Sequence, residues 1–100
     1  MYRATTPTHT FEIPFDVATA KEILITYCQS EKIILEKRLQ DCNIDGNCIS
    51  VKLTRHESNL FDRKKNVEIQ MRVLTQGGDA LASQICTEPC WRVLNDEVLE

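Results

Sequence analysis

The stretch from Asn66 to Thr87 constrains the fold of this chain more than any other. Its first half alternates apolar with polar side chains, the apolar ones being Val67, Ile69, Met71 and Val73. A period of two is typical of a strand with one buried face. Gly77-Gly78-Asp79 then interrupts the pattern, and a second alternating run extends from Leu81 to Ile85. The stretch therefore predicts a β-hairpin.

The register of this hairpin follows from the length of its loop. A loop of even length sets Val73 opposite Ala82 and Met71 opposite Gln84. A three-residue loop from Gly77 to Asp79 instead sets Thr75 opposite Leu81, Val73 opposite Ser83 and Met71 opposite Ile85. Because the second register gathers more apolar surface on one face, we predict the three-residue loop, with Met71 and Ile85 on the core side.

The N-terminal part of the chain predicts a loose segment followed by strands. Residues 1–10 contain few apolar side chains and are expected to be a flexible lead-in. Phe11, Ile13 and Phe15 then alternate with Glu12 and with Pro14, which cannot donate a ladder hydrogen bond, so an edge strand or a strand with a break is expected.

The segment from Lys21 to Leu39 allows two interpretations. Its β-branched run from Ile23 to Tyr27 favours two strands joined by a turn at Gln29-Ser30-Glu31. The alternative is one helix from Val17 to Gln40, supported by the many helix formers after Glu31, which would give an α+β protein. We prefer the strands.

Turn and cap signals order the middle of the chain. Asp45-Gly46 predicts a two-residue hairpin loop that pairs Cys42 with Ile49. The strand that follows, from Cys48 to Leu53, is expected to bury Ile49, Val51 and Leu53. Thr54 and Glu57 then have the spacing of a capping box, which predicts one short helical turn. After it, the side chains of Leu60 and Phe61 are expected to close the end of the core.

Together these signals predict an all-β, antiparallel immunoglobulin-like β-sandwich with one short helical turn. The sandwich is expected to span residues 11–94 and to end in a short strand around Trp91 and Val93. An acidic tail, residues 95–100, follows.

Composition excludes several classes of function. The formal net charge is −3, and a nucleic-acid-binding protein usually carries a basic face, so no nucleic-acid partner is expected. The single basic cluster, Arg63-Lys64-Lys65, is expected to be a solvated loop. There is no secretory signal and no apolar run of roughly 20 residues, so we expect a cytoplasmic or virion-associated protein without a membrane partner. Five cysteines, an odd number, predict free thiols.

A search for chemistry finds one candidate, the pair Cys86 and Cys90. In an alternating strand the two thiols point to the same face, but a zinc site needs two further ligands. His9, His56 and the distant cysteines do not supply them at metal-ligand spacing. No nucleophile–base pair and no phosphate-binding glycine loop is present, and Tyr27 and Trp91 are expected to be core aromatics. We therefore predict no enzyme, and no catalytic, cofactor-binding or metal residues.

Several short segments resemble the small immunoglobulin-like proteins of phage and prophage tail regions. They are Asn47–Thr54, then Glu57, Leu60-Phe61, Val67–Val73 and Gly78–Ser83. In layout they are similar to the N-terminal domain of phage baseplate upper proteins. The resemblance implies a β-sandwich with a structural or assembly role in a particle, and it transfers no catalytic residue.

The favoured hypothesis is a non-enzymatic structural or assembly module of a phage or prophage particle, acting through contacts with other protein chains, such as phage tail components, or with itself. The central hairpin or the Cys48 strand is its expected contact surface, because an exposed strand edge is a template for another chain. The alternative is a small metal- or redox-responsive protein that uses Cys86 and Cys90.

Overall fold

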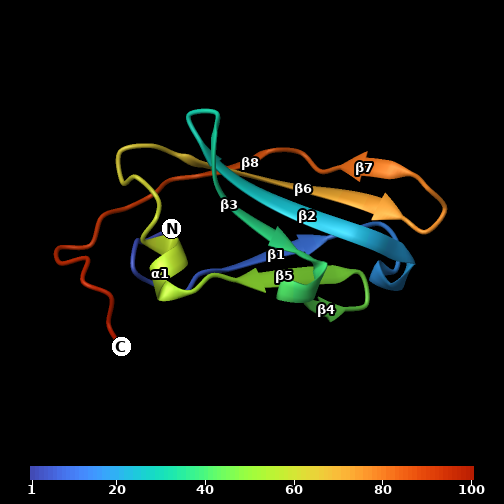
Figure 1. The fold of residues 1–100 in the computed structure, drawn as a ribbon, viewed down its shortest axis with the longest axis horizontal. Helices are drawn as coiled ribbons and strands as arrows, with labels where there is room; N and C mark the ends of the chain where they lie inside the picture. Colours follow the sequence, from blue (N-terminus) through green and yellow to red (C-terminus); the bar gives the residue numbers. More distant parts are fainter.

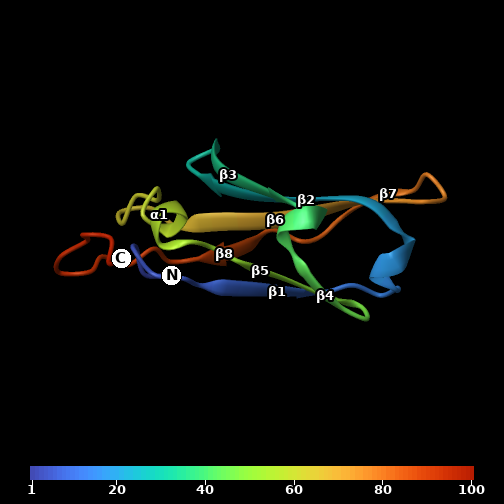
Figure 2. The same ribbon diagram turned by 60° about the horizontal axis from the view of Figure 1, so that its bottom comes forward.

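Two antiparallel sheets packed face to face form this protein, and the computed structural model describes all of residues 1–100 (Figures 1 and 2). The first sheet has the order β1 (Thr8–Glu12), β5 (Cys48–Lys52), β4 (Asn43–Asp45). The second has the order β3 (Lys32–Arg38), β2 (Ala20–Gln29), β6 (Val67–Thr75), with β7 (Ala80–Ala82) and β8 (Cys86–Glu88) both on the outer side of β6. The only α-helix is one turn, α1 (Arg55–Ser58), and two 3-10 turns, η1 (Val17–Thr19) and η2 (Leu39–Asp41), complete the fold. The predicted all-β sandwich is confirmed.

The order of the strands in the two sheets is that of an immunoglobulin sandwich. Such a sandwich has strands A-B-E-D in one sheet and C-F-G in the other, and variable-type domains add C′ beside C. Here β1-β5-β4 follows B-E-D, and β3-β2-β6 with β7 and β8 follows C′-C-F-G. No strand of residues 1–100 takes the position of strand A, so β1 is an edge strand.

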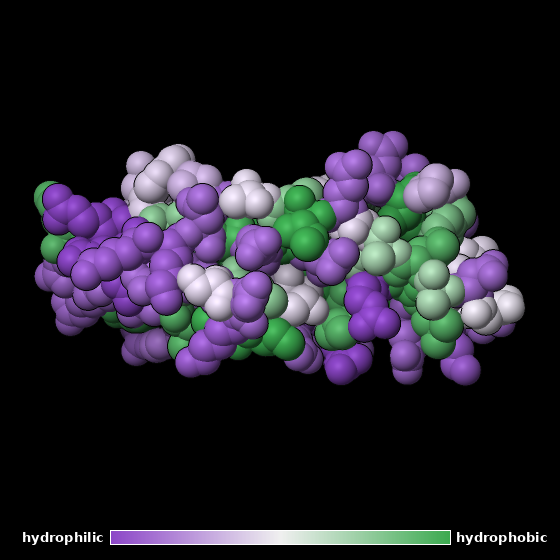
Figure 3. Space-filling model, turned by 90° about the horizontal axis from the view of Figure 1, so that it is seen from above, coloured by the Kyte–Doolittle hydropathy of each residue, from purple (hydrophilic) through white to green (hydrophobic).

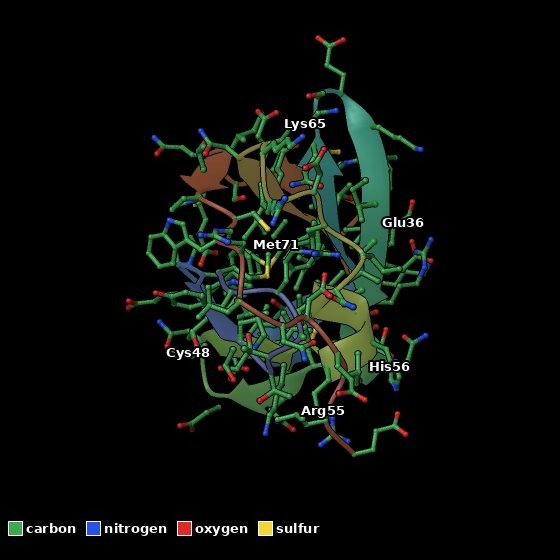
Figure 4. All side chains as sticks on the ribbon, turned by 90° about the vertical axis from the view of Figure 1, so that its left-hand side faces the viewer. Glu36, Cys48, Arg55, His56, Lys65 and Met71 are labelled. Atoms are coloured by element: carbon green, nitrogen blue, oxygen red, sulfur yellow. The ribbon has the colours of Figure 1, made fainter.

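The hydrophobic core lies between the two sheets and is built by the alternating residues of three strands. Val67, Ile69, Met71 and Val73 of β6 are all buried, as the period-two pattern predicts. They pack in one cluster with Ile23, Ile25 and Tyr27 of β2 and with Ile49 and Val51 of β5. Seen along the strands, Met71 lies in the interior between the layers (Figure 4).

The segment from residue 20 to residue 38 is a hairpin of two strands, so the helical alternative is wrong. Its turn is formed by Ser30 and Glu31, which take positive φ angles of 50° and 66°. Two consecutive residues with positive φ match the twist of the flanking strands. The long run of β-branched residues pairs with β6 along nearly the whole length of β2.

The loop predicted at Asp45-Gly46 lies one residue later. Asp45 pairs with Cys48 and Ile44 with Ile49, so the loop residues are Gly46 and Asn47. Gly46 takes a φ of 62° at the first loop position, where a type II′ turn requires a positive angle. The predicted pairing of Cys42 with Ile49 is therefore wrong.

The central hairpin has the predicted loop of three residues, but the loop begins one residue earlier. Thr75 N–H donates to Asp79 O at 2.9 Å, and Val73 pairs with Leu81. Met71 faces Ser83 rather than Ile85, and the Ser83 hydroxyl accepts from Met71 N–H at 3.0 Å. Because this side chain takes the place of a ladder carbonyl, the strand breaks after β7, and β8 resumes with its register shifted by one residue.

This break overturns the predicted core position of Ile85. The residue lies in the irregular link between β7 and β8, and its side chain is 56% exposed. Leu81 is also exposed, although its predicted face was the core side.

The predicted helical turn is confirmed, whereas Leu60 and the N-terminal segment differ from their predictions. In the capping box, Glu57 N–H donates to Thr54 Oγ1 at 3.1 Å and Thr54 N–H donates to Glu57 Oε1 at 2.8 Å. Of the two residues expected to close the core, Phe61 is buried and Leu60 is exposed. Residues 1–10 are not a loose lead-in: Met1 is buried, and β1 already begins at Thr8.

Candidate functional site

The most distinctive surface is the side of the sandwich bordered by β1 in one sheet and by β7 and β8 in the other, here called the seam. In an immunoglobulin sandwich strand A runs along this side, next to strand B. β1 is an edge strand of the first sheet, and β7 and β8 form the edge of the second. One half of the seam is closed by side chains and by the first residues of the chain, and the other half is open.

A chain of hydrogen bonds closes the first half. The amino group of Met1 lies 2.9 Å from the Glu88 carboxylate, and His9 Nε2 donates to the same carboxylate at 2.9 Å. The other ring nitrogen of His9 lies 2.9 Å from the Tyr27 hydroxyl. Since His9 belongs to β1 and Glu88 to β8, this contact ties the two sheets together across the seam.

The pKa values of Tyr27 and Glu88 in this cluster are shifted by burial and by the neighbouring charged and hydrogen-bonding groups. Burial, and after it the nearby charges of Cys42 and Glu88, raise the pKa of the Tyr27 phenol. Burial alone would raise the pKa of Glu88 too, but the hydrogen bond from the terminal amine and the charge of His9 lower it below its usual value. Each polar group therefore has its partner inside the cluster, an arrangement that stabilises the fold. Tyr27 is a core aromatic as predicted, and its ring packs on Phe61 with the ring centroids 5.9 Å apart.

Backbone contacts of the first residues continue this closure. Arg3 N–H donates to Trp91 O at 3.2 Å, and Trp91 N–H donates to Met1 O at 2.8 Å. Tyr2 and Trp91 form a single parallel bridge, and their rings pack at 4.9 Å between centroids. Trp91 is 49% exposed, so the prediction that it is a core residue is wrong.

The second half of the seam is an apolar groove of about 560 Å³. One wall is the end of β1 and the residues after it, Thr10 to Phe15, and the other wall runs from Leu81 to Cys86. Met71 and Val73 of β6 form its floor, and Glu12 is the one charged residue in the lining. In a view from above, apolar side chains gather toward the end of the molecule where β7 lies, whereas the opposite end is mostly hydrophilic (Figure 3).

The backbone of β1 has free hydrogen-bonding groups at this groove. Ile13 N–H donates to Asn47 O and Leu53 N–H donates to Pro7 O, both at 2.9 Å. Neighbouring residues of an antiparallel strand point their backbone groups to opposite sides, so the odd-numbered residues of β1 bond to β5. The N–H and C=O groups of Thr8, Thr10 and Glu12 therefore point away from β5, and Thr10 and Glu12 line the groove.

The same reasoning applies to β7 on the other wall. Ser83 N–H donates to Met71 O at 2.8 Å, and Thr75 N–H donates to Asp79 O at 2.9 Å. The odd-numbered residues thus bond to β6, and the backbone groups of Ala80 and Ala82 point outward. The groove is bordered by two strand edges that have no partner in this chain.

The two cysteines singled out in the sequence lie in different environments. Cys86 is exposed on β8, whereas Cys90 is 4% exposed in the core. The expectation that both point to one face depended on an unbroken strand through both residues, but β8 ends at Glu88, before Pro89. All five cysteines are free thiols, and no group of three or more His, Cys, Asp or Glu side chains is placed to hold a metal ion.

The remaining candidate positions are distributed over the surface. Lys65, from the basic cluster, lies at the periphery, and His56 lies in α1, far from Lys65 (Figure 4). His56 Nε2 is 2.7 Å from the Glu100 carboxylate, and both side chains are exposed. The Cys48 strand, expected as a contact edge, lies between β1 and β4 and therefore has no free edge.

Sequence reasoning missed the residues that organise the seam and its surroundings. His9 was considered only as a metal ligand, and its bridge to Tyr27 and Glu88 joins positions 18 and 79 residues away in sequence. Gln29 and Ser58 are the two buried polar side chains, and their partners likewise come from distant segments. The one local signal was the polar residue Gln29 at the end of an alternating apolar run, on the buried face.

No protein-family model matches the chain, and neither a curated protein nor a solved structure matches it. No helix in the structure has the length and apolar character required to span a bilayer.

Proposed function

We propose that this chain is a non-enzymatic structural or assembly module of a phage or prophage particle and acts through contacts with other protein chains. The observation that carries the proposal is the open half of the seam. An apolar groove flanked by two unpaired strand edges is a surface that another polypeptide can cover. The resemblance of Asn47–Thr54 and Val67–Val73 to phage tail proteins supplies the biological setting.

The polar groups of the seam fit a structural role better than a catalytic one. A general acid or base must reach the proton that it transfers. The His9 ring, however, is engaged on both nitrogens, and the Glu88 carboxylate is shared between His9 and the terminal amine. In this arrangement the side chains join the two sheets.

The hypothesis of a metal- or redox-responsive protein has no comparable support. It requires Cys86 and Cys90 to act together, and one thiol is exposed while the other is buried. Metal analysis of protein purified without chelator, with thiol counting before and after reduction, tests it directly. Bound metal in stoichiometric amount would support the metal-responsive hypothesis.

The phage setting is tested on purified particles. Particles from a strain that carries the gene are isolated on a density gradient, and their proteins are quantified by mass spectrometry. We expect the chain to co-migrate with tail components at a fixed copy number. Its absence from particles, together with neighbouring genes that encode no tail or capsid component, would refute this setting.

A further inference from the structure

We propose that the groove in the seam binds an extended strand donated by another polypeptide, which pairs with β1 at the position that strand A holds in immunoglobulin sandwiches. This inference rests on the proposed function and names the chemistry of the partner. Its starting point is the coincidence of three features at one place: the topological position of strand A, an apolar groove of about 560 Å³, and the free edge of β1.

Backbone pairing favours β1 as the template. Thr8, Thr10 and Glu12 each present one N–H and one C=O group to the open edge, and β1 is five residues long. β7 is three residues long and presents only Ala80 and Ala82. A donated strand antiparallel to β1 can therefore form more backbone hydrogen bonds than one paired with β7. It also has the same direction relative to β1 as strand A has relative to strand B. Pro14 has no N–H, so pairing ends there.

The walls of the groove determine the side chains of the donated strand. Successive side chains of a strand point to opposite faces, so every second residue enters the groove and meets Met71, Val73 and Leu81. Those residues must be apolar, because the floor offers no polar partner for them. The alternate residues remain in solvent beside Glu12, the one charge in the lining, which favours Lys or Arg there.

A second copy of this chain fits the groove less well. Two β1 strands paired antiparallel about Thr10 would bring His9 and Phe11 of the second copy to the groove. Those side chains already have partners within their own sandwich: His9 bonds to Tyr27 and Glu88, and Phe11 packs on the core. Glu12 would also lie opposite Thr8 of the second copy rather than opposite a cation. A donated strand from a different polypeptide meets neither conflict.

The test uses a fluorescein-labelled peptide of sequence Lys-Val-Thr-Val-Lys-Val-Thr-Val-Lys, titrated with the folded protein by fluorescence anisotropy. A second peptide has the same composition with its valines grouped together, which removes the alternation. A third carries N-methyl groups on the amides that face β1, which removes the donors. We expect saturable binding of the first peptide only, since the other two lose the groove contacts or the backbone pairing.

Two variants locate the binding on the protein. Leu81→Asp places a charge on the groove wall, and Ile44→Asp places the same charge on β4, away from the groove. The two side chains have similar exposure, 45% and 49%, so both variants are expected to fold, which circular dichroism checks. We expect the dissociation constant to rise by about tenfold or more in the first variant and to stay unchanged in the second.

Binding that is equal for all three peptides, or equal in both variants, overturns the proposal. So does the absence of binding at protein concentrations up to about 1 mM. Sedimentation velocity adds one more outcome: a dimer that Leu81→Asp converts to a monomer would identify a second copy as the occupant, and the donated strand would be wrong. Strand binding by a chain that is absent from particles refutes the phage setting alone, whereas a particle component that binds no strand refutes this inference alone.

Discussion

Replacing Gln29 by Leu removes the side chain that holds the segment between α1 and β6. Gln29 is 3% exposed at the end of β2. Its amide nitrogen donates to Asp62 O at 2.8 Å and to Lys65 O at 3.0 Å, and its amide oxygen accepts from Asp62 N–H at 2.8 Å. Leu has nearly the same volume, so the variant loses the hydrogen bonds without opening a large cavity.

The magnitude follows from what happens to the three released backbone groups. A buried group left without a partner costs about 1–3 kcal/mol. Asp62 and Lys65 are exposed residues, so water can reach part of their backbone and the lower end of that range applies. We expect Gln29→Leu to lower the free energy of unfolding by about 2–3 kcal/mol, which corresponds to a fall in Tm of roughly 8–20 °C for a domain of this size.

The assay is urea unfolding followed by circular dichroism, with Gln76→Leu as the matched control. Gln76 is exposed, and its side chain makes no hydrogen bond within the chain, so the control is expected to stay within about 0.5 kcal/mol of the original protein. Amide hydrogen exchange at Asp62 should accelerate in Gln29→Leu only. A loss of stability no larger than that of the control would refute the reasoning that this amide anchors the segment.

Three further predictions concern titratable groups. Burial alone would raise the pKa of Glu57, but the hydrogen bond and charge of Lys37 lower it below its usual value. The Glu57 carboxylate therefore stabilises the fold above the unfolded pKa of about 4.3. This contribution is lost as the pH falls through the pKa of Glu57 in the folded protein. Glu57→Gln should therefore cost about 0.5–1 kcal/mol in urea unfolding near pH 7 and nothing near pH 2; an equal cost at both would contradict this. Because burial raises the pKa of Tyr27, its phenol should stay protonated near pH 11 and ionise on denaturation, giving a rise in tyrosinate absorbance that Tyr27→Phe removes. Cys86 should react with a thiol reagent at least about tenfold faster than Cys90, whose pKa is raised by burial, and equal rates would show that the C-terminal strand opens.

The sequence was sufficient where the signal is local. The alternation in Val67–Val73 and the β-branched run Ile23–Tyr27 predicted strands, and both are strands. The capping box of Thr54 and Glu57 predicted a helical turn at the place where α1 lies. These features depend on side chains only a few residues apart, so their physical cause can be read from neighbouring positions.

Register was harder to predict because it depends on single contacts across the sheet. The apolar pattern allowed several pairings of β6 with the strand after it, and the contact of the Ser83 hydroxyl with Met71 N–H is the feature that breaks this strand. At the other hairpin, the conformation of Gly46 moved the loop by one residue. The break after β7 moved Ile85 from its predicted core position to the surface.

The sequence by itself determined that this chain forms two-faced strands, and therefore a β-sandwich, because the burial of alternate apolar side chains leaves few other arrangements. Only the tertiary structure decided which strand edges stay free. Edge position is a property of the order of strands in the sheet, and it follows from pairings between residues far apart in the chain, such as those of β1 with β5. The groove beside β1 exists because the edges of two sheets lie on the same side of the sandwich. Its two walls come from segments far apart in the sequence, so no local pattern predicts it.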